Sequence, residues 1–181
     1  MPIKNAYPEL PIVDCVITSI PMKDIEAYIQ TLPYIAEVKR TVHVITRNET
    51  GNGKSFLSNN GIGQQADGAR LSDKWIPFIK GTFLKVENMR QEDGSRKERR
   101  FVAFKDWKTS IALLADRVFN RGGWIGENID SNYYKGDVKT VDDLATWYWR
   151  EWVKGSKTSS PDKTFVNDFK NMYNKASTIF L

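Results

Sequence analysis

The stretch YIAEVKRTVHVITRNETGNGKS, residues 34–55, decides the fold of this chain. Its apolar residues recur three, four and three positions apart, which is the spacing of one face of an α-helix. These residues are Ile35, Val38, Val42 and Ile45. The pattern predicts an amphipathic helix whose buried face includes all four; since β-branched residues lower helix propensity, a strand is the alternative. One further helical step reaches Glu49, just before a Gly- and Asn-rich segment.

Glu49 therefore has the expected surroundings of a general acid. Partial desolvation and the negative end of a helix dipole both raise the pKa of a carboxyl group. A carboxyl group that stays protonated near neutral pH can donate its proton to a leaving group. The alternative is a solvated glutamate on a frayed last turn. The helical spacing taken alone favours this alternative.

The amino-acid composition limits which kinds of catalytic or metal site the chain can form. The 181 residues suffice for one domain, and the 40% hydrophobic and 12% aromatic content is that of a chain with a packed core. A single cysteine, Cys15, excludes an intramolecular disulfide and a cysteine-rich zinc site, and a single histidine, His43, argues against a histidine-based metal site or triad. We therefore expect no metal or organic cofactor. The net charge of +5 suits an anionic polymer as partner.

The remaining chain predicts a mainly α, α+β protein. We expect an N-terminal lead-in over residues 1–33, packed on a single domain over residues 34–181, with a β lobe at about residues 78–104. Helices are expected after Pro21, from Asp106, from Thr140 with Asp143 as a capping box, and from Ser160–Pro161. Residues 124–139 are expected to form a loop.

Two segments, ETGNGKS at residues 49–55 and NGIG at residues 60–63, carry a resemblance to a known family. They resemble the helix-end and loop signature of the lysozyme-like glucosaminidases, peptidoglycan hydrolases that include flagellar muramidase-type, autolysin and phage endolysin domains. The order of elements is similar over roughly residues 35–121. The resemblance implies a lysozyme-like helical domain in which a small β-hairpin lobe forms one side of a substrate cleft.

The resemblance also implies two catalytic carboxylates. Glu49 matches the position of the family's catalytic acid, and Glu87, 38 residues further along, is the best match to the second carboxylate. Glu87 would stabilise the cationic transition state or orient the attacking water. Glu92 and Asp93 are competing candidates, and a merely solvated or ion-paired Glu87 is the alternative.

Six further residues are candidates for substrate binding. The polar ones follow Glu49 in the chain, and the aromatic ones, which can stack on sugar rings, come from the later loop. They are Asn60, Gln65, Arg70, Trp124, Tyr133 and Tyr134.

These features predict a peptidoglycan hydrolase that cleaves β-1,4 bonds of the glycan strand, of N-acetylglucosaminidase or muramidase type. The alternatives are a non-catalytic virion structural or cell-wall-binding protein with the same fold, and a lytic transglycosylase. The N-terminal residues carry prolines and acidic residues where a signal peptide has an apolar run, which fits a phage- or virion-associated enzyme with virion partners, or export by another route. We expect no nucleic-acid partner and, without an apolar run of about 18 residues, no membrane span.

Overall fold

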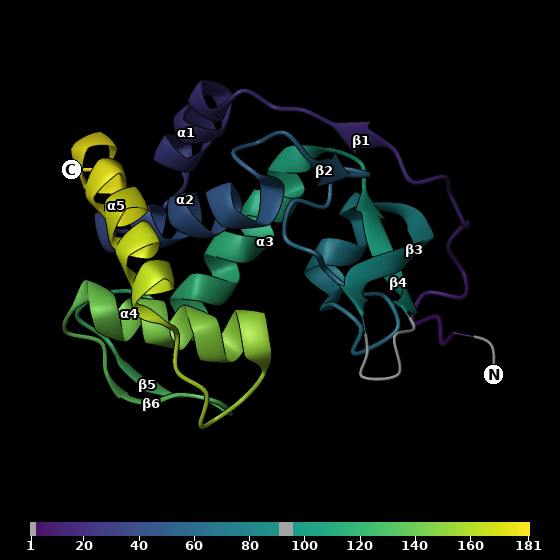
Figure 1. Cartoon of the computed structure of the whole chain (residues 1–181). Coiled ribbons are helices and arrows are strands. Elements are labelled where there is room, and N and C mark those ends of the chain that lie inside the picture. The colour runs from purple at the N-terminus through teal and green to yellow at the C-terminus, as the bar shows by residue number, and fades with distance from the viewer. Residues whose placement is uncertain (1–2, 91–95) are drawn as a thin grey trace. The chain divides into compact units, whose positions relative to one another are not determined.

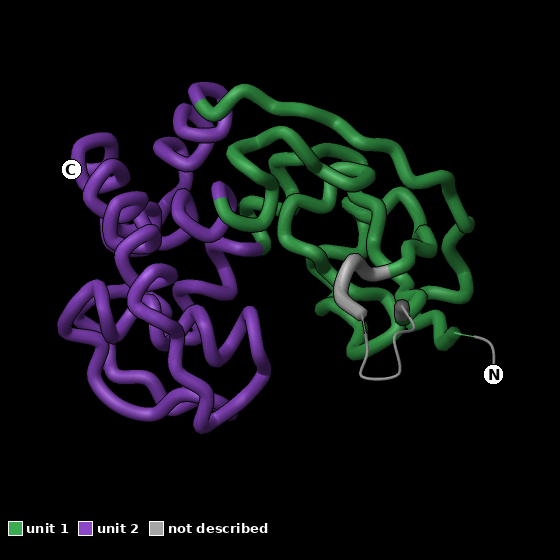
Figure 2. The backbone as a smooth tube through the Cα atoms, in the orientation of Figure 1, with its two compact units in different colours: residues 1–22, 48–113 green, residues 23–47, 114–181 purple. Residues whose placement is uncertain are grey.

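A computed structural model describes residues 3–90 and 96–181 of the chain, with the backbone alone for residues 87–90 and 96. Figure 1 shows helices together with short two-stranded antiparallel sheets, which confirms the predicted α+β class. The chain forms two compact units (Figure 2). Unit 1 comprises Met1–Met22 and Asn48–Leu113, and unit 2 comprises Lys23–Arg47 and Leu114–Leu181. The predicted division into a lead-in and a single domain stays a prediction.

Unit 1 contains the predicted β-hairpin. Strands β3 (Ile79–Arg90) and β4 (Arg96–Phe104) pair antiparallel, and Phe83 lies opposite Phe101 with ring centroids 5.8 Å apart. A 3₁₀ turn, Asp73–Phe78, leads into β3. The N-terminal segment joins this unit through β1 (Ile17–Thr18), which pairs with β2 (Phe56–Leu57). The large buried side chains of unit 1 include Tyr7, Phe56, Phe83 and Phe104.

Unit 2 is mostly helical. Its elements are most of α1 (Met22–Thr31), α2 (Ala36–Thr50) as far as Arg47, α3 (Trp107–Asn120) from Leu114, α4 (Val141–Tyr148), the π-helical turn Trp149–Lys154, and α5 (Lys163–Ile179). The large buried side chains here include Ile25, Trp147, Tyr148 and Phe169.

The structure confirms α2 as a helix and excludes the strand alternative. Val38, Val42 and Ile45 are fully buried, as their helical spacing predicts. The prediction for Ile35 is wrong, because this residue precedes the helix and is 49% exposed. Residues 41–46 are all buried, so the helix is enclosed on more than one face.

Helix starts depend on short polar side chains, as expected. The Oδ1 of Asp106 accepts a hydrogen bond from the backbone N–H of Thr109 (2.9 Å) at the start of α3, and Thr140 and Asp143 form the predicted capping box of α4. The predicted start of the last helix at Ser160–Pro161 is wrong, because Asp162 is its N-cap.

The expected loop over residues 124–139 contains a hairpin instead. Strands β5 (Asn128–Asp130) and β6 (Lys135–Asp137) pair antiparallel. Each strand has three residues, and Ile129 is their only apolar residue, so no alternating pattern signals them. Within the described ranges, no helix is both long and apolar enough to cross a bilayer.

Candidate functional site

The predicted acid, Glu49, lies in the last turn of α2. The helix ends sharply because the next three residues have left-handed backbone angles, a conformation that L side chains rarely adopt. The φ values are +57° for Gly51, +60° for Asn52 and +82° for Gly53. The hydroxyl of Thr50 accepts a hydrogen bond from the N–H of Gly53 (2.8 Å), which closes the turn. The position of Glu49 at the end of the helix is therefore set by a defined turn.

The side chain of Glu49 is exposed, while that of its neighbour Thr50 is fully buried. The partial burial expected for Glu49 is therefore not found. The helical face that carries Val42 and Ile45 inward ends before Glu49, and Thr50 takes the inward position in the last turn.

Asn60 is a structural residue. It is 4% exposed, its Nδ2 donates to the carbonyl oxygens of Gln64 and Val102 (both 2.9 Å), and its Oδ1 accepts from the N–H of Gln64 (2.9 Å). These bonds hold the loop after β2 against β4. The substrate-binding role predicted for Asn60 stays a prediction beside this role in ordering the loop.

Gln65 lies beside an ion pair that links the same loop to the hairpin. The guanidinium of Arg99 in β4 donates to both carboxylate oxygens of Asp67 (2.6 and 3.0 Å) and to the side-chain oxygen of Gln65. The hydrogen bond from Arg99 lowers the pKa of Asp67. The sequence offers no local signal for this partnership, because 32 residues separate Arg99 from Asp67.

Arg70 contacts the N-terminal segment. Its guanidinium donates to the carbonyl oxygen of Ala6 (2.9 Å) and to the carboxylate of Glu9 (2.5 Å), and lies 4.9 Å from the centroid of the Tyr7 ring. These contacts attach the loop of Arg70 to the start of the chain.

The second predicted carboxylate, Glu87, lies in β3, where the structure describes the backbone alone. Its neighbour Val86 pairs with Glu98 of β4, so Glu87 belongs to the distal half of the hairpin. The competing candidates Glu92 and Asp93 lie outside the described residues.

The three aromatic candidates belong to unit 2. Trp124 stacks on Phe119, with parallel rings and centroids 6.5 Å apart. Tyr134 is partly buried; burial raises the pKa of its hydroxyl, and the guanidinium of Arg150 lies 5.8 Å from its ring. Tyr133 is 36% exposed and lines a pocket of about 680 Å³ within unit 2.

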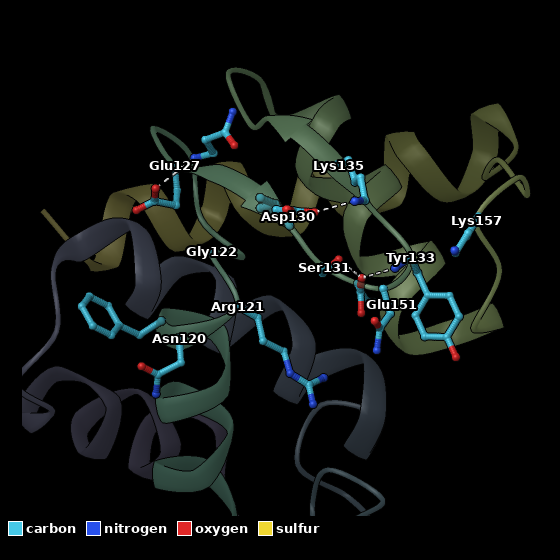
Figure 3. Close-up of a pocket in the computed structure, with 14 residues that line it drawn as sticks. Asn120, Arg121, Gly122, Glu127, Asp130, Ser131, Tyr133, Lys135, Glu151 and Lys157 are labelled. Atoms are coloured by element: carbon cyan, nitrogen blue, oxygen red, sulfur yellow. Dashed lines mark hydrogen bonds and ion pairs between the residues drawn. The ribbon is translucent and has the colours of Figure 1, made fainter.

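This pocket lies among the end of α3, the β5–β6 hairpin and the turns after α4 (Figure 3). Its described lining consists of Phe119, Asn120, Arg121, Gly122, Glu127, Asn128, Ile129, Asp130, Ser131, Asn132, Tyr133, Lys135, Glu151 and Lys157. Tyr133 is the one predicted site residue in this lining. The sequence did not predict this pocket, because the β5–β6 hairpin that forms part of its lining was expected to be a loop.

The structure thus brings Gln65 into one cluster with Asp67 and Arg99 in unit 1, and places Tyr133 in the pocket of unit 2. In the described part of the chain, no three His, Cys, Asp or Glu side chains are grouped so as to hold a metal ion.

The chain matches no known protein-family model and no curated protein. Among solved structures, its fold is similar to that of the catalytic domain of the autolysin Auto from Listeria monocytogenes, with a TM-score of 0.51. The similarity covers 90% of this chain and 89% of the other, and the two sequences are 17% identical. The fold of this chain is therefore similar to that of an autolysin catalytic domain.

Proposed function

We propose that this protein is a peptidoglycan hydrolase that cleaves a β-1,4 bond between the aminosugars of the glycan strand. The observation that carries the proposal is the exposed carboxylate of Glu49 at the end of α2, on a fold similar to that of an autolysin catalytic domain. The defined turn after Thr50 supports it, since a catalytic group must be held in place before substrate arrives.

In the proposed reaction, protonated Glu49 donates its proton to the glycosidic oxygen as the bond between that oxygen and the anomeric carbon breaks. The anomeric carbon develops positive charge, which the carboxylate of Glu87 stabilises, directly or by orienting the attacking water. The substrate's own acetamido group can assist at the same carbon. Water finally adds to the anomeric carbon and its released proton returns to a carboxylate. Of the two bond types, we favour the one cleaved by an N-acetylglucosaminidase.

The test is the Glu49→Gln variant, which keeps the shape of the side chain but cannot supply the proton. We expect clearing of a cell-wall suspension to fall about 10²- to 10⁴-fold while the thermal melting curve stays that of the parent protein. Glu98→Gln removes another exposed glutamate of unit 1 and is the matched control, with activity retained. An active Glu49→Gln protein would contradict the proposal.

Two further measurements complete this test. Glu87→Gln, Glu92→Gln and Asp93→Asn are compared, and only the first is expected to lower activity. Mass spectrometry of the released fragments identifies the sugar at the new reducing end, and anhydro ends would indicate transglycosylation instead of hydrolysis.

A further inference from the structure

The pocket of unit 2 contains an aromatic residue, Tyr133, whose backbone is held by hydrogen bonding. The N–H of Tyr133 donates to the carboxylate of Glu151 (3.0 Å), and the hydroxyl of Ser131 donates to the same carboxylate (Figure 3). The hydroxyl end of the Tyr133 side chain lies near Gly155, where an added Cβ would be 3.9 Å from the Cζ and the hydroxyl oxygen. Because the Tyr133 side chain is 36% exposed, its ring is accessible to a sugar ring that stacks on it.

The wall of the pocket opposite Tyr133 is closely packed. Gly122, just after α3, has a φ of +66°, and a Cβ there would lie 2.9 Å from Glu127 and 3.0 Å from Ile129 of the hairpin. The base of the hairpin therefore lies directly against the turn that follows α3. The pocket's volume of about 680 Å³ exceeds that of one sugar ring and lies within the usual range of ligand sites.

The acidic side chains of the lining all have hydrogen-bond or ion-pair partners. Asp130 pairs with Lys135 (2.8 Å), Glu151 accepts from Ser131 and Tyr133, and Glu127 accepts from the N–H of Asn128 (3.0 Å).

The cations Arg121 and Lys157 are exposed, and among the described residues neither has an ion-pair partner. In the view of Figure 3 the two side chains lie on different sides of Glu151. Guanidinium and ammonium groups without an ion-pair partner among the described residues favour a ligand that carries a carboxylate.

We propose that this pocket binds the acidic muropeptide part of peptidoglycan, with an aminosugar ring against Tyr133 and carboxylates of the attached peptide at Arg121 and at Lys157. The inference rests on the proposed function for its choice of polymer. It assigns to unit 2 the selection of peptide-bearing glycan over an uncharged aminosugar polymer.

The experiment measures binding to the Glu49→Gln protein, which prevents turnover, by calorimetry. The probes are a disaccharide muropeptide, which is acidic, and chitobiose, which has the same number of sugar rings and no charge. We expect the muropeptide to bind about tenfold more tightly than chitobiose. Replacing Arg121 and Lys157 together by Gln should abolish this preference and leave chitobiose binding unchanged, whereas Tyr133→Leu should weaken both. Lys163→Gln, which removes an exposed lysine outside the lining, is the control and should change neither.

A mapping experiment covers the case in which the Tyr133 variant does not fold. In an NMR titration of the Glu49→Gln protein, the amides of residues 128–135 should shift with the muropeptide. Equal affinity for the two probes, a preference that survives loss of both cations, or shifts confined to other residues would overturn the inference. Failure of the proposed function is distinguishable, because it would appear as retained activity of Glu49→Gln or an inactive parent protein while the muropeptide still binds the pocket.

Discussion

At the scale of single residues, Thr50 holds the turn that follows Glu49 at the end of α2. Its side chain is fully buried, and its hydroxyl accepts the N–H of Gly53 across a turn of three left-handed residues. Without that acceptor, the buried Gly53 N–H loses its partner and the end of α2 is released. Thr50 is therefore a positioning residue for the proposed acid.

We predict that Thr50→Val lowers the free energy of unfolding by about 1–3 kcal/mol. Valine keeps the shape of threonine but cannot accept the hydrogen bond, so kcat should fall with little change in KM. Thr50→Ser, which retains the hydroxyl, should recover most of the lost activity. Urea unfolding and wall-clearing kinetics measure both effects, and a Thr50→Val protein as stable and active as the parent would contradict the prediction.

His43 is the second residue with a measurable consequence. It is fully buried in α2, its Nε2 lies 2.9 Å from the carboxylate of Glu26, and its Nδ1 has no partner within the described residues. Burial lowers the pKa of His43 below its ordinary 6.5, while the hydrogen bond of Glu26 opposes that shift; the charges of Arg47 and Lys175 lower it further. The folded protein therefore holds His43 neutral where the unfolded chain would protonate it.

We predict that stability falls as the pH drops below 6.5, the ordinary pKa of histidine. In the window between 6.5 and the lower folded pKa, the unfolded chain binds a proton that the folded protein does not, so the free energy of unfolding decreases by up to about 1.4 kcal/mol per pH unit. Urea unfolding from about pH 7.5 to about pH 5 should show this slope, and His43→Asn should abolish it. Glu26→Gln should extend the slope to lower pH, because it removes the group that raises the His43 pKa. An unchanged slope in His43→Asn would exclude His43 as the cause.

At the scale of elements, the apolar spacing of α2 and the polar N-caps of α3 and α4 are local features, and they predict these helices correctly. The β3–β4 hairpin follows in the same way from β-prone runs on either side of a polar segment. The β5–β6 hairpin could not be predicted, because its strands have three residues each and contain a single apolar residue, Ile129.

The start of α5 offers an element-scale prediction with a matched control. Asp162 accepts a hydrogen bond from the N–H of Phe165 (2.8 Å), while Ser160 lies outside the helix. We predict that Asp162→Ala lowers the free energy of unfolding by about 1 kcal/mol and that Ser160→Ala leaves it unchanged. Thermal or urea unfolding compares the two variants, and an equal effect of both would contradict the assignment of the cap.

At the scale of the whole molecule, the net charge of +5 predicts that binding to an anionic wall is partly electrostatic. We expect sedimentation of Glu49→Gln protein with purified walls to decrease when salt is raised from about 0.05 M to about 0.5 M, since screening shortens the range of charge attraction. Walls stripped of their anionic polymers should bind less protein and respond less to salt. If the amount of protein bound to intact walls does not change with salt concentration, charge attraction does not contribute to the binding.

By itself, the sequence determined the α+β class, the helix that carries Glu49 in its last turn and the β3–β4 hairpin, because helix periodicity, capping and strand propensity act between residues close in the chain. Only the tertiary structure decided that Asn60 orders a loop, that Arg70 holds a segment 64 residues away, and that Tyr133 lines a pocket. Each of these roles depends on a partner brought near by folding. A polar or aromatic residue in a loop has no periodic pattern from which that partner can be inferred.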